Sequence, residues 1–107
     1  HDGDLQTLQR ILLGQQYGTF HPDGHQTGLA TVALVQAAVQ GKTPQSTGYI
    51  NGTFLNGFYP QGVPTYLTPE TLVTAANMQQ TVVDEGFLPK DQICTALVAN
   101  TAFCKGS

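Results

Sequence analysis

The C-terminal third of the chain constrains the fold more than any other stretch. Residues 63–69 are rich in strand-forming side chains and run to a proline, which favours an extended segment that ends there. A helical pattern follows, with Thr74 or Ala75 at its start, Glu85 as its last residue and Gly86 just beyond it. Cys94 and Cys104 lie in the tail. This order of strand, helix, stop and cysteine loop indicates the end of a domain.

The two cysteines favour a disulfide. Two thiols alone cannot make a tetrahedral zinc site, and their spacing is not the Cys-x-x-Cys of redox proteins. A local disulfide between Cys94 and Cys104 is therefore the best interpretation, and it would imply an oxidising compartment. The alternative is two unpaired thiols, one of them buried.

The preceding residues predict alternating helices and strands. Residues 4–13 place leucines and an isoleucine at helical spacing, with Asp2 available as the N-cap, and residues 17–20 favour a short strand. Residues 26–40 predict a helix that is apolar on most sides and hence buried on most sides, with Gly41 as its C-cap. One or two short strands are expected within residues 45–62. This order favours an α/β layer with a parallel sheet.

Composition narrows the function classes. The chain has 107 residues, enough for one small domain, and only 10% are charged, against about 25% in an ordinary soluble domain. Such a surface suggests coverage by a partner or by missing chain. Four Lys and Arg residues and a net charge of −3 argue against nucleic acid as a partner. No apolar run is long enough to span a membrane, and no signal peptide is visible. The chain begins at His1 without a methionine, which indicates processing or a fragment.

A series of short motifs resembles the xylose-type periplasmic sugar-binding proteins, a family of substrate-binding components of ABC importers. Each motif alone is weak, but together they follow the family's order over nearly the whole chain. The segments that carry the resemblance are His1–Ile11, Gly14–Phe20, Gly41–Pro44, Val63–Pro64, Leu67–Pro69, Asn77, Val82, Gly86–Phe87 and Ile93–Cys104.

The resemblance implies an α/β fold: a partial three-layer lobe of the periplasmic-binding-protein type, with parallel strands and flanking helices. Residues 1–107 would form a single, partial C-terminal sugar-binding lobe with a hinge strand and a disulfide-closed tail. A monosaccharide, xylose-like, would bind between two lobes without catalysis or cofactor. The implied partners are a membrane ABC permease and the remaining N-terminal portion of the protein or another chain. The implied location is periplasmic or extracellular, which allows a lipid anchor through a missing N-terminus.

The resemblance also suggests ligand-binding residues. Asp2 matches the family's acidic residue that accepts hydrogen bonds from sugar hydroxyls, a task that suits the two acceptor oxygens of a carboxylate. Its alternative role is a simple helix N-cap. The family's lysine contact falls at Pro22, so His21 or His25 are the substitute donors to consider, and this departure puts xylose itself in doubt. Tyr17 and Phe20 are the candidate aromatic contacts nearest to Asp2; the resulting ligand-binding set is Asp2, Tyr17, Phe20 and His21.

Other chemistries have weaker support. The His and Asp side chains near the N-terminus could be read as a metal cluster, but no tight ligand motif is present and a polar turn explains them as well. No nucleophile elbow or phosphate-binding loop occurs, and no metal or catalytic site is expected. Asn51-Gly52-Thr53 is a glycosylation sequon. The rival hypothesis is a secreted structural α/β module that assembles with another chain and binds no sugar.

Overall fold

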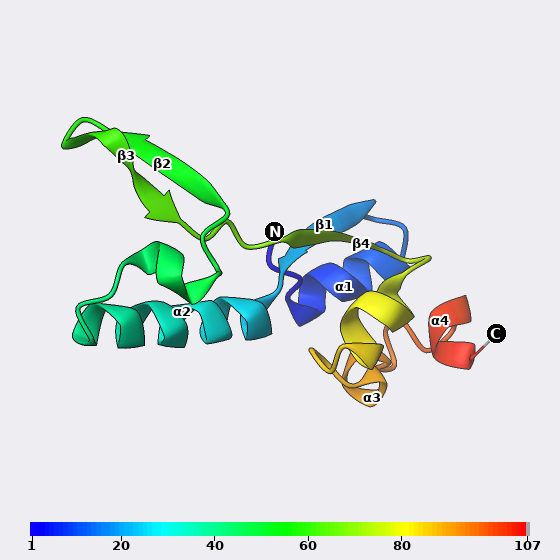
Figure 1. Ribbon diagram of the computed structural model, residues 1–107. Helices are drawn as coiled ribbons and strands as arrows, with labels where there is room; N and C mark the ends of the chain where they lie inside the picture. Colours follow the sequence, from blue (N-terminus) through cyan, green and yellow to red (C-terminus); the bar gives the residue numbers. More distant parts are fainter. Residues whose placement is uncertain (107) are drawn as a thin grey trace. The chain divides into compact units, whose positions relative to one another are not determined.

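The computed structural model describes residues 1–106 (Figure 1). The elements are α1 (Leu5–Leu12), β1 (Gly18–Pro22), α2 (Gly24–Val39), η1 (Pro44–Thr47), β2 (Gly52–Asn56), β3 (Tyr59–Thr65), β4 (Glu70–Thr74), η2 (Gln79–Asp84), α3 (Lys90–Ile93) and α4 (Ala102–Lys105). They form two compact units. Unit 1 comprises His1–Pro22 and the chain from Glu70 onward, and unit 2 comprises Asp23–Pro69. The assignment of residues 1–107 to one partial lobe stays a prediction.

Helix α1 starts at a different aspartate from the one expected. The Asp4 carboxylate, not that of Asp2, accepts the Thr7 N–H at 3.0 Å and caps the helix. Gly14, with φ +71°, turns the chain after the helix. The apolar side of α1 supplies Leu8 and Ile11 to the interior of unit 1.

Strands β1 and β4 are paired side by side in unit 1 (Figure 1). They run antiparallel, with Thr19 opposite Val73 and Phe20 opposite Leu72. The expected parallel arrangement is wrong for this pair, because the chain leaves β1 at Pro22 and returns next to the same point: Asp23 N–H donates to the Pro69 carbonyl at 3.3 Å. The returning strand must then run back along β1, whereas a parallel neighbour requires a crossover to the far end of the sheet.

The core of unit 1 lies on one face of the β1–β4 pair. The buried side chains that meet there come from α1, β4, α3, η2 and the residue before η2, and they are Leu8, Ile11, Val73, Met78, Val82 and Ile93. The amide of Gln9 joins α1 to the tail: it donates to the Ile93 carbonyl at 3.1 Å and to Thr95 Oγ1 at 3.0 Å. A buried amide that is hydrogen-bonded in this way avoids the cost of desolvation.

The tail contains the expected disulfide between Cys94 and Cys104. The helix expected from Thr74 or Ala75 begins later, because Thr74 ends β4 and its N–H donates to the Asn77 side chain at 2.7 Å. The turns that follow are wide and form the π-helix η2. Gly86, with φ +76°, lies just past the end of η2, as expected.

In unit 2, β2 and β3 form an antiparallel hairpin, so the parallel expectation is wrong here too. Gly57 and Phe58 alone connect the two strands, and so short a connection can join only antiparallel neighbours. Asn51 closes the open end of the hairpin, since its amide donates to the Leu67 carbonyl at 2.9 Å and its carbonyl accepts the Leu67 N–H at 2.7 Å.

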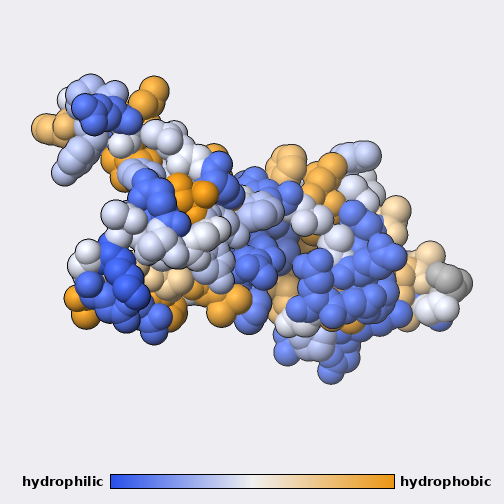
Figure 2. Space-filling view, viewed as in Figure 1, coloured by the Kyte–Doolittle hydropathy of each residue, from blue (hydrophilic) through white to orange (hydrophobic). Residues whose placement is uncertain are grey.

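Helix α2 starts at the Asp23 cap and ends before Gly41, close to the expected bounds. The expectation that it is buried on most sides is wrong for the described residues. Only Ala30 and Ala37 are buried in it, and Figure 2 shows apolar patches along it. Its exposed large side chains are Leu29, Val32, Val35 and Val39. Several large apolar side chains exposed along one helix are normally covered by other parts of the protein or by a partner.

Candidate functional site

The Asp2 carboxylate stands at the surface of unit 1 on a fixed turn. Asp2 has φ +75°, an uncommon value for a residue other than glycine, and the next residue, Gly3, also has a positive φ. The Asp2 N–H donates to the Phe20 carbonyl at 2.8 Å, which ties the turn to β1. The Asp2 side chain is 74% exposed. The backbone therefore holds this residue in place while its carboxylate stays available.

A second carboxylate lies close by. The His1 ring contacts Asp2 through Nδ1 and Glu70 through Nε2, the latter at 3.1 Å. One imidazole thus joins the two acids, using one oxygen of each. Within residues 1–106, the other oxygen of each carboxylate has no hydrogen-bond partner. Both acids can therefore accept further hydrogen bonds.

Phe20 and Leu72 supply apolar surface on the strand face that carries Glu70. They are directly opposite each other in the pair, and Glu70 is two residues from Leu72, so all three side chains belong to the same face. Phe20 is 48% exposed and Leu72 40%. We call His1, Asp2, Phe20, Glu70 and Leu72 the carboxylate face.

His21 belongs to the opposite face of β1 and is buried at 8% exposure. Its ring packs on Phe87, with 4.0 Å between the centroids, and a Cβ added at Gly3 would lie 3.6 Å from its Nδ1. His21 thus lies beneath the turn that carries Asp2 and does not share its surface. Its Nδ1 has no partner within the described part of the chain. The other substitute donor, His25, is exposed on α2 in unit 2.

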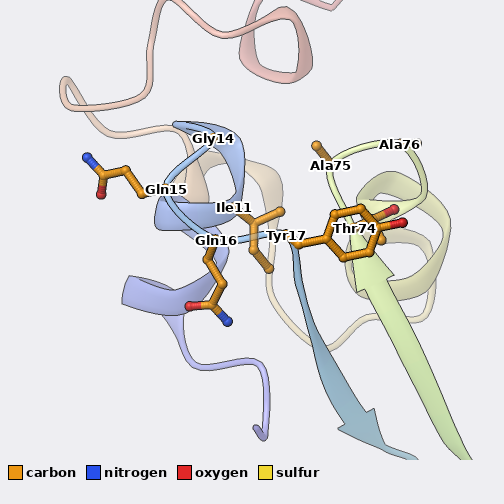
Figure 3. A pocket seen from close by; sticks show the side chains of 8 residues that line it. All are labelled: Ile11, Gly14, Gln15, Gln16, Tyr17, Thr74, Ala75 and Ala76. Carbon is orange, nitrogen blue, oxygen red and sulfur yellow. The ribbon is translucent and has the colours of Figure 1, made fainter.

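Tyr17 lines a separate pocket in unit 1 (Figure 3). This pocket lies between the turn after α1 and the end of β4, and it has no residue in common with the carboxylate face. Of the four expected ligand residues, the structure therefore brings Asp2 and Phe20 together. It places Tyr17 in another hollow and His21 in the core.

Sequence reasoning missed Glu70 and Leu72. Their place beside Phe20 depends on the pairing of β1 with β4, and the Glu-Thr-Leu-Val-Thr segment was not expected to be a strand. Its β-branched residues Thr71, Val73 and Thr74, which favour a strand, were the available signal.

The carboxylate face has the chemistry of a site for a neutral, hydroxyl-rich ligand. Carboxylate oxygens accept charge-assisted hydrogen bonds from hydroxyls, and an aromatic ring packs on the C–H face of a sugar ring. Residues 1–106 contain no group of three His, Cys, Asp or Glu side chains arranged to hold a metal ion, so the structure does not assemble the cluster considered from the sequence. Across the same residues, no helix has the length and apolar character needed to cross a membrane.

Two curated relatives are periplasmic sugar-binding proteins. The chain is 30% identical to the multiple sugar-binding periplasmic receptor ChvE of Rhizobium radiobacter, over 86% of the chain and 25% of the relative. It is 31% identical to the multiple sugar-binding periplasmic protein SbpA of Azospirillum brasilense, over 85% of the chain and 24% of that relative. No family model matches the chain.

A solved structure has the same fold. It is an ABC transporter solute-binding protein from Clostridium phytofermentans with bound β-D-glucose, and it matches with a TM-score of 0.72 and 24% identity. The match covers 86% of the chain and 27% of that structure. The expected α/β class is confirmed by this match.

These matches account for most of the chain but for only about a quarter of each relative. Both relatives are named as sugar-binding proteins, which agrees with the resemblance seen in the sequence. The chain is therefore a homologue of part of the periplasmic sugar-binding receptors, and it has the fold of a segment of an ABC solute-binding protein.

Proposed function

We propose that the protein carrying this chain is the exported substrate-binding component of an ABC sugar importer, and that it binds a monosaccharide between two lobes without catalysis. The observation that carries this proposal is the exposed Asp2 carboxylate, fixed to β1 and placed beside Glu70 and the half-exposed Phe20. The homology to periplasmic sugar-binding proteins supports the same assignment. The implied partners are the sugar, a membrane ABC permease and the remainder of the receptor, and the implied location is the periplasm or the cell exterior.

Asp2 would hold the sugar by accepting hydrogen bonds from its hydroxyls. The turn fixes the Asp2 backbone before the ligand arrives, so the backbone loses little conformational freedom on binding. Phe20 would pack against the C–H face of the ring, and Glu70 would accept a further hydroxyl. His1 joins the two carboxylates and thereby offsets the repulsion between them when the imidazole is protonated.

We propose an aldose monosaccharide as the ligand and give glucose priority over xylose. The two curated relatives are named for multiple sugars, and the matched solute-binding protein holds β-D-glucose. Pro22 stands where the resemblance to xylose-type proteins calls for a lysine, and proline has no side-chain donor. A xylose-specific contact of that kind is therefore lost.

Isothermal titration of the full-length protein with D-glucose and D-xylose tests this proposal. We expect binding of glucose, and a loss of affinity of about 10- to 100-fold in Asp2→Asn, the range for a hydrogen bond to a charged group. Glu85→Gln is the matched control, because Glu85 is an exposed carboxylate of unit 1 outside the carboxylate face. An unchanged affinity in Asp2→Asn would remove Asp2 from the site.

The second candidate is a structural module that assembles with another chain and binds no sugar. The exposed apolar side chains of α2 favour it, because such a face is normally covered. The same titration separates the two functions. Absence of heat with every aldose tested, together with a stable complex with another chain, would favour the assembly module.

A further inference from the structure

The hollow around Tyr17 is lined by 8 residues of unit 1: Ile11, Gly14, Gln15, Gln16, Tyr17, Thr74, Ala75 and Ala76 (Figure 3). We call it the Tyr17 pocket. We propose that it is a second, weaker binding site for a neutral sugar ring, distinct from the carboxylate face. The two sites share no residue, so this inference does not depend on Asp2 or on the proposed importer function.

The walls of the Tyr17 pocket are fixed by local structure. Ile11 is buried at the end of α1, and Gly14 with φ +71° turns the chain towards β1. Gln16 Nε2 donates to the Gly18 carbonyl at 2.8 Å, which braces the segment that carries Tyr17. On the other side, the Asn77 side chain accepts the Thr74 N–H at 2.7 Å and holds the bend after β4. The backbone segments that form the walls of the pocket are therefore held in place.

The lining of the Tyr17 pocket is free of charge and combines apolar surface with hydrogen-bonding groups. None of its residues is acidic or basic, so the pocket offers no counter-charge to an ionic ligand. Ile11 and the alanines supply apolar surface. The Tyr17 hydroxyl and the Gln15 amide have no side-chain partner within residues 1–106. A neutral ligand with an apolar face and hydroxyl edges matches this lining.

Tyr17 is the central contact of the proposed site. Its side chain is 83% exposed, and Figure 3 shows the ring extending from the start of β1 towards Thr74. Ala75 and Ala76 are small, so the space beside the ring stays open. An accessible aromatic ring beside hydrogen-bonding groups is an arrangement on which a pyranose can stack.

The size of the pocket agrees with a monosaccharide. Its volume is ≈ 500 Å³, within the range of roughly 300–1,000 Å³ that is usual for small-molecule sites. Since it contains no charged group, it lacks the strong charge-assisted hydrogen bonds available at Asp2. We therefore expect a dissociation constant in the millimolar range, well above that of the carboxylate face.

Amide NMR of the ¹⁵N-labelled full-length protein, titrated with D-glucose to about 100 mM, tests the second site. In a first phase, the amide signals near Asp2 should shift and saturate. In a second phase, the amide signals of residues 14–17 and 75–76 should shift with a millimolar midpoint. Tyr17→Ala should raise the dissociation constant of the second phase about tenfold, the scale of one lost aromatic contact. Tyr17→Phe keeps the ring, so it should retain most of the affinity. Tyr59→Ala, which removes an exposed tyrosine of unit 2, is the control and should change neither phase.

The Asp2→Asn protein separates this inference from the proposed function. If both are correct, Asp2→Asn raises the midpoint of the first phase about 10- to 100-fold and leaves the midpoint of the second phase unchanged. Loss of the second phase in Tyr17→Ala supports the second site even if no first phase is found. Absence of shifts at residues 14–17 and 75–76, or the same shifts in wild type and Tyr17→Ala, would overturn it.

Discussion

Asp2 and Asp4 are two residues apart, and their backbone conformations give them different tasks. Asp4 is extended, with φ −61° and ψ 157°, so its carboxylate folds back over the first turn of α1 and accepts hydrogen bonds from Thr7. Asp2 has φ +75° and lies outside the helix, so its carboxylate is not used for capping. Asp4 is therefore engaged in capping α1, and Asp2 is available for a ligand.

The hydrogen bonds to Asp4 make α1 sensitive to acid. The Thr7 hydroxyl, followed by the Thr7 N–H, lowers the pKa of the Asp4 carboxyl below its ordinary value of 3.8. A lowered folded-state pKa stabilises the fold above the ordinary value, and this contribution is lost as the pH falls through the folded-state pKa. We expect the stability difference between wild type and Asp4→Asn to shrink below about pH 4 when acid unfolding is followed by circular dichroism.

Thr7→Val provides the internal check on this assignment. It removes the hydroxyl that lowers the pKa most and keeps the backbone donor, so the pKa of Asp4 should move up towards 3.8 in a carboxyl NMR titration. An unchanged pKa in Thr7→Val would contradict the stated cause.

At the residue scale, the sequence identified the candidate side chains but could not orient them all. Asp2 and Asp4 both suit a helix N-cap, and only the positive φ at Asp2 decides between them. His21 is adjacent to Phe20 in β1, so the two side chains must point to opposite faces. Which face is buried depends on β4 and the core beneath it, which are distant in sequence.

At the scale of elements, the hairpin of unit 2 depends on a close approach at Gly62. Gly62 has φ +86°, and a Cβ placed there would lie 2.1 Å from the Thr53 side chain. Gly62→Ala should therefore lower the free energy of unfolding by about 1–3 kcal/mol, the cost of one strained backbone residue. Chemical denaturation monitored by circular dichroism measures this change.

Gly57→Ala is the matched control, since it lies in the same hairpin and a Cβ there would have nothing within 4 Å. It should change the unfolding free energy by less than about 1 kcal/mol. Equal midpoints for the two variants would contradict the role assigned to Gly62.

The elements that were predicted correctly have strong local signals. The apolar spacing of α1, the glycine after α2 and the disulfide between Cys94 and Cys104 can each be recognised from neighbouring residues. The direction of pairing could not be predicted. Alternating helices and strands favoured a parallel sheet, but the direction of β4 depends on how unit 2 returns the chain beside Asp23. β4 itself is short and follows a proline, so the sequence pattern did not predict it as a strand.

At the scale of the whole molecule, the low charge of the chain and the exposed apolar side chains of α2 both favour a surface that is covered by further polypeptide. Only 10% of the residues are charged, and the apolar side chains of α2 are exposed in unit 2. Under the proposed function, the remainder of the receptor would cover this helix. The chain spans about a quarter of the length of the relatives that it matches. Coverage of this surface by a partner or by missing chain stays a prediction.

The measurement that tests the central claim most directly is a crystal structure of the full-length protein with D-glucose. We expect an Asp2 carboxylate oxygen within about 2.5–3.0 Å of a sugar hydroxyl, the normal distance for a charge-assisted hydrogen bond, and the Phe20 ring in contact with the sugar. A sugar bound with no atom within hydrogen-bonding distance of Asp2 would contradict the assignment of the carboxylate face as the binding site.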